Sequence, residues 1–324
     1  MKSALICGVS GQDGSYLARL LISKGYEVYG SSRDAQMQSF DNLRALGIKD
    51  KVNLVSMATT DFRSVLHAVS HVAPDEIYNL AGQSSVAMSF EQPLQTMESI
   101  GISTLNLLEA IRFTAANTKF YSAGSSECFG ASAKQPCDEN TPFRPRSPYA
   151  VAKAAAFWSV ANYREAYGLH ACTGILFNHE SPLRPERFVT RKIIATAARI
   201  ASGSNEKLHL GNLSISRDWG WAPEYVEAMW MMMQLDQAQD FVIATGQTCT
   251  LEEFVDAAFD AVGLHWHEHV VVDETLFRPA DLAESRANPA KAQSALGWRA
   301  RHAARDVVRM MLDAELGKPA STTR

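Results

Sequence analysis

The chain has 324 residues, of which 46% are hydrophobic and 20% charged, and its formal net charge is −4. A mildly acidic chain of ordinary globular composition argues against a nucleic-acid or anionic-membrane binder, because such proteins carry an excess of basic residues. At this length the chain exceeds one comfortable hydrophobic core, so a large domain with a smaller lobe is expected.

The cysteine content and the first residues bear on localisation. The five cysteines are odd in number, and no two stand at CxxC spacing, which favours reduced thiols packed as small hydrophobes. A strand is predicted almost from the start, and no apolar run approaches the roughly 18 residues of a membrane span. We therefore expect a cytoplasmic protein with no membrane partner.

The first half of the chain alternates short apolar segments with longer amphipathic ones. Helices are predicted between the strands, for example at 15–24, 64–72 and 103–114. Strand–helix alternation of this kind is typical of parallel βαβ units with helices on both faces of the sheet. The expected fold is α/β, a Rossmann-type doubly wound parallel sheet, with strands at 4–7, 27–30, 52–55, 76–80, 119–123, about 171–177 and about 240–244.

The regular alternation loosens at 178–220 and again at 247–324, where loop signals and arginines are more frequent. We expect these separated C-terminal segments to form a smaller α/β lobe that binds the substrate. Residues 1–177, together with about 221–246, would then form the cofactor-binding domain. The methionine-rich segment 229–233 is predicted to be a buried helix, since methionine fills irregular gaps in a core.

A glycine-rich segment, Gly8-Val9-Ser10-Gly11-Gln12-Asp13-Gly14, follows the first predicted strand and opens the first helix. Glycines allow a tight turn and close approach of the backbone, and a helix N-terminus attracts a pyrophosphate. This context predicts dinucleotide binding. At the tip of the second strand stands Arg33, with no acid before it, which favours NADP over NAD. Arg33 as a solvated loop residue, neutralised by the adjacent Asp34, is the alternative.

Two further motifs point to chemistry. If residues 149–165 are helical, Tyr149 and Lys153 lie one turn apart on one face, and the ammonium is expected to favour the phenolate of Tyr149. A phenolate can accept the proton of a secondary alcohol. Ser125 and Glu127, about twenty residues earlier, offer a second acid/base pair. An enzyme that only transfers a hydride would not need this second pair.

Three histidines, His265, His267 and His269, alternate at the spacing of a strand, so their imidazoles would share one face. Such a face could bind a metal. We interpret it as a polar strand face instead, and we predict no metal site.

Taken together, these motifs resemble the extended short-chain dehydrogenase/reductase family and, within it, the GDP-mannose 4,6-dehydratases. The resemblance spans nearly the whole chain and is most specific at 178–184, 188–192 and 217–220. The matching stretches are 8–16, 78–86, 120–130, 138–153, 174–184, 188–192, 210–212, 217–220, 225–230, 241–246 and 278–280.

The resemblance implies a role for each matching residue. Tyr149 and Lys153 would oxidise the sugar alcohol, and Glu127 would remove the C5 proton, with Ser125 standing where the family usually has threonine. NADP would contact Tyr149, Lys153, His179, Arg184 and the turn Leu80, Ala81, Gly82, Gln83 and Ser84. The GDP-sugar would be held by Ser85, Asn178, Lys192, Arg217 and Arg278.

The chain departs from the family pattern near these sites. Asp34 replaces the second arginine of an Arg-Arg pair, which weakens the expectation of NADP, and Pro185 replaces a glycine. Asp281 and Ala283 stand where the family has glutamate and aspartate, so the sugar is less certain than the reaction type. A 4-keto-6-deoxy-sugar reductase, an epimerase, a dehydratase of another GDP-sugar such as a GDP-heptose, and an inactive nicotinamide-binding protein remain alternatives. A homodimer or homotetramer is expected.

Overall fold

The computed structural model describes residues 1–114, 117–131, 135–277 and 280–318. Seven parallel strands form the central sheet in the order β11-β6-β5-β4-β1-β2-β3. This order confirms the predicted Rossmann-type doubly wound sheet. The strands are β1 (Ser3–Cys7), β2 (Glu27–Ser32), β3 (Asn53–Ser56), β4 (Glu76–Asn79), β5 (Lys119–Ala123), β6 (Ala171–Leu176) and β11 (Phe241–Ile243).

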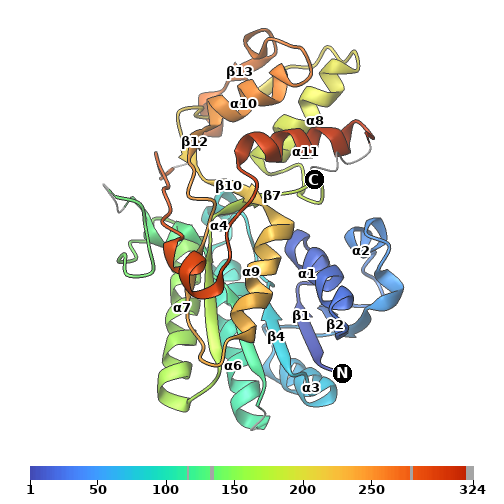
Figure 1. Cartoon of the computed structure of the whole chain (residues 1–324), viewed down its shortest axis with the longest axis vertical. Coiled ribbons are helices and arrows are strands. Elements are labelled where there is room, and N and C mark those ends of the chain that lie inside the picture. Colours follow the sequence, from blue (N-terminus) through green and yellow to red (C-terminus); the bar gives the residue numbers. More distant parts are fainter. Residues whose placement is uncertain (115–116, 132–134, 278–279, 319–324) are drawn as a thin grey trace.

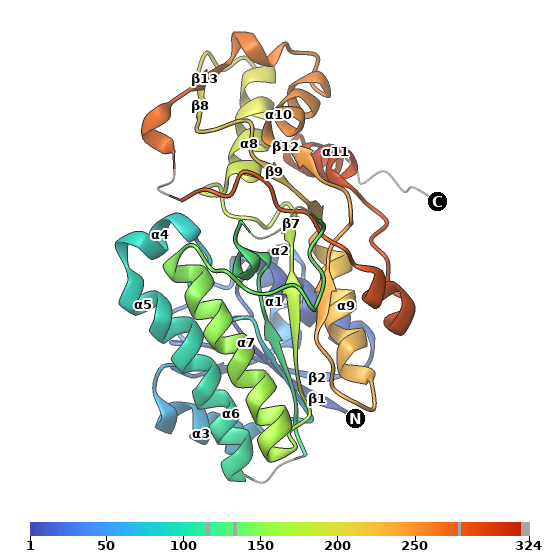
Figure 2. The ribbon, with the colours of Figure 1, turned by 90° about the vertical axis from the view of Figure 1, so that its left-hand side faces the viewer.

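Helices cover both faces of the sheet (Figure 2). One layer contains α1 (Gln12–Ser23), α2 (Asp41–Ala45) and α9 (Ala222–Gln234). The other contains α3 (Phe62–Val72), α6 (Ser103–Thr114) and α7 (Pro148–Tyr167), with the short helices α4 (Val86–Glu91) and α5 (Pro93–Met97) beside α7. Met229, Met232 and Met233 of α9 are fully buried against α1, as the methionine-rich sequence predicts.

Local sequence explains where the long helix α7 begins and ends. The hydroxyl of Ser147 accepts a hydrogen bond from the backbone N–H of Ala150 (3.1 Å), and Pro148 occupies the first helical position. Gly168 ends the helix in the left-handed conformation, with φ of 68°. The start of α7 is therefore well defined, and this matters because Tyr149 and Lys153 lie in its first two turns.

A smaller lobe lies beyond the carboxyl ends of the strands (Figure 1). Its core joins α8 (Val189–Ala201), α10 (Leu251–Asp260) and α11 (Ala304–Glu315), with buried Ile193, Phe254 and Met311 among the contacts. Short strand pairs complete it, namely β8 (Leu208–Leu210) with β13 (Val270–Val272) and β9 (Ser216–Arg217) with β12 (Cys249–Thr250). Near the sheet, β7 (Asn178–Glu180) pairs with β10 (Trp219–Trp221).

The histidine-rich segment does not form the predicted strand face. Residues Trp266–Glu268 form a single 3₁₀ turn, and the Trp266 ring stacks on His267 with centroids 3.8 Å apart. His269 stacks instead on Phe259 of α10, at 5.7 Å. Local ring stacking thus overrides the alternating pattern, and the three imidazoles do not share a strand face.

In the part of the chain that the structure describes, no helix combines the length and the apolar character that crossing a bilayer requires.

Candidate active site

The predicted site residues gather where the central strands end. From β1 the chain adds β2 and β3 on one side of the sheet and then crosses to β4, β5, β6 and β11 on the other side. The strand order therefore reverses between β1 and β4, which are neighbours in the sheet. Open α/β sheets bind their ligands in the crevice beyond the carboxyl ends at such a switch point. The glycine-rich turn follows β1, and the 80–84 turn follows β4.

The glycine-rich turn is packed too closely for side chains at two positions. Gly8 has a φ of +84°, and a Cβ atom there would lie 2.9 Å from the carbonyl oxygen of Leu80. A Cβ on Gly14 would lie 2.3 Å from the carbonyl oxygen of Gly8. Because these two positions carry no side chain, the glycine-rich turn packs directly on the residue after β4 and on the first turn of α1.

The start of α1 fits the pyrophosphate of a dinucleotide. Gly11 caps the helix and is exposed, and glycine has no side chain with which to bind the N–H groups of the first turn. Those groups and the positive end of the helix dipole suit an anion. The side chains of Gln12 and Asp13 instead face β7, where they bond to His179 and Ser181.

The tip of β2 presents Arg33 to solvent directly after Ser32. The neighbouring Asp34 carboxylate accepts hydrogen bonds from the backbone N–H groups of Gln36 (2.9 Å) and Met37 (3.0 Å). Asp34 therefore serves the turn that follows the strand. The Arg33 guanidinium is exposed at the strand tip, where an anionic group of a ligand could contact it.

Close packing and the hydrogen bonds of Gln83 hold the turn after β4 in place. Gly82 has a φ of +124°, and a Cβ there would lie 2.9 Å from the carbonyl oxygen of Ser99. The Gln83 amide donates to the carbonyl oxygen of Ser85 (2.7 Å) and to the hydroxyl of Thr96 (3.3 Å). Ser85 caps α4 by accepting from the backbone N–H of Met88 (3.3 Å). The predicted contact residues of this turn are Leu80, Ala81, Gly82, Gln83 and Ser84.

The structure brings the four predicted catalytic residues together. Lys153 donates a hydrogen bond from Nζ to the carbonyl oxygen of Ala123 at the end of β5 (2.7 Å), and Nζ lies 5.8 Å from the centroid of the Tyr149 ring. Ser125 accepts a hydrogen bond from the backbone N–H of Glu127 (3.3 Å), and the 3₁₀ turn Ser126–Phe129 that carries Glu127 packs against α7. The Glu127 charge acts on the Tyr149 phenol.

The electrostatics of the pair differ from the prediction. Burial raises the pKa of Tyr149, and the nearby Cys128 and Glu127 raise it further, although the Ser125 hydrogen bond opposes this. Burial also lowers the pKa of Lys153 to about 8. In the protein alone, burial is the largest influence on the Tyr149 pKa, and it opposes the phenolate that the sequence predicts.

Two predicted cofactor residues follow β6. His179 lies between the carbonyl oxygen of Phe177 (2.7 Å from Nδ1) and the carboxylate of Asp13 (3.0 Å from Nε2). Arg184 forms an ion pair with the buried Glu180 (3.2 Å), and its guanidinium lies 3.7 Å from the centroid of the Phe188 ring.

The predicted substrate residues lie toward the lobe. Asn178 begins β7, Lys192 of α8 donates to the carbonyl oxygen of His209 (2.7 Å), and Arg217 is nearly buried. Arg217 donates to the carbonyl oxygen of Leu282 (2.7 Å) and to Asp281 (3.0 Å). Arg278 lies outside the residues that the structure describes.

Sequence reasoning missed the role of Asp218, which follows Arg217. Its carboxylate is fully buried and accepts from both the N–H (3.1 Å) and the hydroxyl (2.9 Å) of Thr245 and from the N–H of Gly246 (2.7 Å). Burial raises its pKa to about 6. Asp218 thus connects the segment of Arg217 to the loop after β11 by hydrogen bonds. In the sequence, the only signal for this role was its position next to Arg217.

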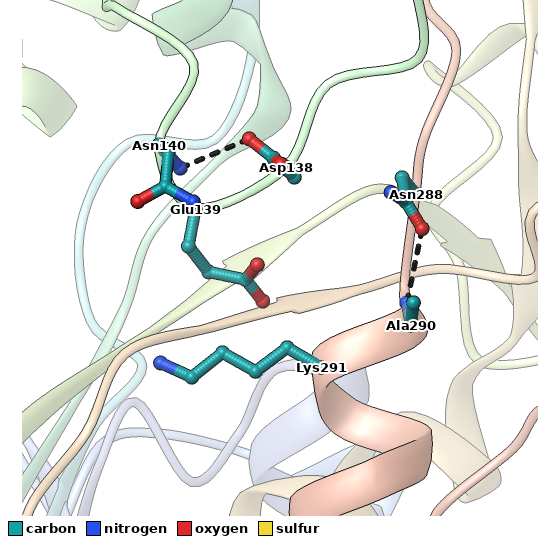
Figure 3. A pocket seen from close by; sticks show the side chains of 6 residues that line it. All are labelled: Asp138, Glu139, Asn140, Asn288, Ala290 and Lys291. Carbon is teal, nitrogen blue, oxygen red and sulfur yellow. Dashed lines mark hydrogen bonds between the residues drawn. The ribbon is translucent and has the colours of Figure 1, made fainter.

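A separate pocket of about 300 Å³ lies beside β11 (Figure 3). The Glu139 carboxylate accepts there from the backbone N–H of Val242 (2.7 Å), and Lys291 donates to the carbonyl oxygen of Asp240 (2.8 Å). None of the described residues that line this pocket is a predicted site residue. The lining residues are Asp138, Glu139, Asn140, Asn288, Ala290 and Lys291.

A glycine-rich turn at the β1/β4 switch point, with Tyr149 and Lys153 one turn apart on the helix that follows β5, defines an extended short-chain dehydrogenase/reductase. Comparison with solved structures agrees with this class. UDP-glucose 4-epimerase of Thermus thermophilus, in complex with NAD, superposes with a TM-score of 0.85 at 26% identity, covering 97% of this chain and 99% of that one. RMD from Pseudomonas aeruginosa, complexed with NADPH, shares the fold, with a TM-score of 0.80, 22% identity and coverage of 98% and 99%.

The chain belongs to the GDP-mannose 4,6-dehydratase family, whose model matches residues 5–311. GDP-mannose 4,6 dehydratase 2 of Arabidopsis thaliana is 47% identical over 97% of this chain and 87% of its own length. GDP-mannose 4,6-dehydratase of Sinorhizobium fredii is 45% identical over 97% of both chains.

Close packing at the glycine-rich turn predicts that Gly14→Ala destabilises the protein. The new methyl group would meet the Gly8 carbonyl, which is backbone and cannot move aside cheaply. Overpacking of this kind costs about 1–3 kcal/mol. Chemical denaturation should show this loss, whereas Gly11→Ala, whose Cβ would lie 3.4 Å from the same carbonyl oxygen, should lose less stability, since it gives up only the preference for glycine over alanine at the N-cap. Equal stability of the two variants would contradict the packing.

Proposed function

We infer that this protein is a GDP-mannose 4,6-dehydratase, a hydro-lyase that converts GDP-mannose to GDP-4-keto-6-deoxymannose. The observation that carries this inference is the second acid/base pair. Ser125 and Glu127 lie in the turn that follows β5 and packs against α7, the helix of Tyr149, so a sugar oxidised at C4 would find another base within the same site. The family membership of the whole chain supports the same reaction.

In the first half of the reaction, Tyr149 takes the proton from the O4 hydroxyl of the sugar. A nicotinamide dinucleotide held at this site would supply the hydride acceptor for C4 and the hydride donor for C6. Lys153 is placed by Ala123 in the turn after Tyr149, where its charge would stabilise the phenolate that accepts the proton. Ser125 also favours this phenolate, because it lowers the pKa of Tyr149.

In the second half, the new C4 ketone makes the C5 hydrogen acidic. Glu127 removes this proton, and the C6 hydroxyl leaves as water with a proton from the same site. Each positioned acid or base contributes about 10²–10⁴ in rate. The hydride is returned within one turnover, so the net reaction is redox-neutral and consumes no cofactor.

We assign the substrate contacts to Ser85, Asn178, Lys192 and Arg217, with Arg278 as a further member outside the described residues. Lys192 and Arg217 supply charge-assisted hydrogen bonds for a nucleotide diphosphate. We propose that residues 1–177 and about 221–246 mainly hold the dinucleotide and that 178–220 with 247–324 mainly hold the nucleotide sugar. Ser85 would reach the sugar from the first part, and His179 and Arg184 would reach the cofactor from the second.

We propose NADP as the cofactor. A nicotinamide dinucleotide fits the free helix N-terminus at Gly11 and the glycine positions. Arg33 stands at the tip of β2, where a ribose 2′-phosphate is recognised in this fold, and Asp34 is engaged by its own turn. The protein contacts would come from Gly8, Gly11, Gln12, Asp13, Gly14, Arg33, Leu80, Ala81, Gly82, Gln83, Ser84, Tyr149, Lys153, His179 and Arg184.

We propose that the protein works in the cytoplasm as a homodimer or homotetramer. Apolar side chains are exposed along the outer layer, including Trp158 of α7 (62% exposed) and Phe113 of α6 (65% exposed). Large exposed apolar groups on adjacent helices are typical of a surface that a second subunit covers.

The reaction is tested by incubating the protein with GDP-mannose and NADP. The expected product is the 4-keto-6-deoxy sugar, with no steady rise in absorbance of the reduced nicotinamide. Glu127→Gln should lower kcat by about 10²–10⁴ because the C5 proton then lacks its base. Glu165→Gln, at the exposed far end of α7, serves as the control.

Other outcomes, in this assay or in parallel assays, would overturn the inference. Consumption of one NADPH per product, when NADPH and a GDP-4-keto-6-deoxy sugar are supplied, would identify a reductase, and a product of GDP-mannose that keeps its C6 hydroxyl would identify an epimerase. Turnover of a GDP-heptose but not of GDP-mannose would retain the chemistry and replace the sugar.

The cofactor assignment predicts that Arg33→Ala weakens NADP binding more than NAD binding. Charge-assisted hydrogen bonds to a phosphate contribute about 1.5–3 kcal/mol, so the dissociation constant for NADP should rise roughly ten- to hundredfold. Calorimetric titration measures both cofactors, with Arg309→Ala on the distant α11 as the control. Equal losses for NADP and NAD would remove the argument for the 2′-phosphate.

The oligomer proposal predicts that Trp158→Glu shifts the protein toward smaller assemblies. A carboxylate in the middle of a covered apolar face would be buried at a high cost. Sedimentation velocity measures the change, and Val272→Glu, at an exposed site in the lobe, should leave the assembly intact. An unchanged sedimentation coefficient for Trp158→Glu would place the subunit contact elsewhere.

A further inference from the structure

Both ring nitrogens of His179 face groups that can only accept hydrogen bonds. Nδ1 lies 2.7 Å from the carbonyl oxygen of Phe177, and Nε2 lies 3.0 Å from the Asp13 carboxylate. A neutral imidazole carries a single N–H, so it could satisfy one of these partners only. The other oxygen of Asp13 accepts from the Gln12 amide (3.0 Å), and the lowered pKa of Asp13 favours the carboxylate. Beside a carboxylate, both contacts of His179 are satisfied together only by the doubly protonated ring.

The surroundings of His179 fix the ring in this orientation. The residue is 8% exposed, and its ring stacks on Tyr225 with centroids 4.4 Å apart and planes 22° apart. Tyr225 is fully buried, and a Cβ on Gly220 would lie 2.4 Å from its ring. The imidazole is thus held between α9 and α1, and it cannot turn toward other partners without disturbing this packing.

Further hydrogen bonds join the same two segments. The Gln12 amide donates to the carbonyl oxygen of His179 (3.2 Å), and the Ser181 hydroxyl donates to the Gln12 amide oxygen (2.7 Å). The first turn of α1 is therefore fastened to β7 and to the residue that follows it. These segments are more than 160 residues apart in the sequence, so His179 and Asp13 fix the geometry of a site that neither segment could form alone.

The charges around the pair favour the ionised form of both partners. Burial alone would raise the pKa of Asp13 and lower that of His179, but their mutual attraction outweighs burial and shifts each pKa the other way. Arg184 also faces both groups, which lowers both pKa values. The other titratable groups that face the pair are Glu180, Tyr225, Tyr16, Tyr121 and Lys153.

We propose that His179 is kept as an imidazolium whose ion pair with Asp13 positions the first turn of α1 and neutralises a carboxylate beside the pyrophosphate of the dinucleotide. Without that partner, the Asp13 carboxylate would repel the incoming phosphates at the helix N-terminus. His179 is then a positioning residue. The ligand named here rests on the proposed function, whereas the charge state of the pair does not.

The sign of the pH dependence follows from the two pKa shifts. Asp13 has a lowered pKa, so its contribution to stability is present above the unfolded value of 3.8 and is lost as the pH falls through the folded pKa. His179 has a raised pKa, so its contribution is present below the unfolded value of 6.5 and is lost as the pH rises through the folded pKa. Binding of the dinucleotide should therefore weaken above neutral pH.

The charge state is tested on the full chain by ¹⁵N NMR of the histidine side chains, without any ligand. Two protonated ring nitrogens are expected for His179 at pH 6.5, with deprotonation only above that pH. A single proton on His179 at pH 6.5 would overturn the proposal. Because this arm uses no dinucleotide, a positive result would stand even if the proposed function failed.

The binding arm measures the NADP and NAD dissociation constants by calorimetry between pH 6.5 and 9. The parent should lose about tenfold in affinity, and binding should raise the pKa of His179 by about one unit in return. His179→Gln should bind more weakly at pH 6.5 and lose the part of the pH dependence that His179 contributes, leaving the part due to Lys153, whose pKa is about 8, and exposed His67→Gln should keep the parent profile. Asp13→Asn, which keeps the shape of the side chain, should lose the same part. A parent-like slope in either site variant would overturn the proposal.

Discussion

The hydrogen bond from Lys153 to the carbonyl oxygen of Ala123 is the interaction on which the candidate active site depends most. It fixes the first turns of α7 against the end of β5, and Ser125 and Glu127 lie two and four residues beyond that strand end. The phenol of Tyr149 is consequently held where both the hydroxyl and the carboxylate influence it. A single contact between a side chain and the backbone thus relates two motifs that are about twenty residues apart in the sequence.

Burial strengthens the electrostatic interactions among these side chains, and it also disfavours their charged forms. The same desolvation that strengthens each interaction in the site raises the pKa of Tyr149 and lowers that of Lys153. The protein alone therefore favours a neutral phenol. The positive charge of an oxidised nicotinamide would add to that of Lys153, which ties proton removal to the presence of the cofactor. The buried pair of Asp13 and His179 behaves in the opposite way, because attraction between the two side chains and their hydrogen bonds outweigh burial and favour both ionised forms.

The seven central strands could be predicted from the sequence because parallel βαβ units leave a strong alternating pattern. The glycine positions and the pairing of Tyr149 with Lys153 were likewise visible, since both depend on local spacing. The lobe strands were not, because elements of two or three residues acquire their structure from tertiary partners. The contact of Asp13 with His179, the role of Asp218 and the pKa shift of Tyr149 were also hidden, since all three depend on packing between distant segments.

The central claim is that one site oxidises C4, eliminates water and returns the same hydride to C6. It is tested most directly with GDP-mannose carrying deuterium at C4, incubated with the protein and unlabelled NADP. Mass spectrometry of fragments of the product should find the deuterium at C6 of the same sugar, with C5 exchanged from the solvent. Appearance of the label in released NADPH, or a 6-deoxy product without the label, would contradict the account.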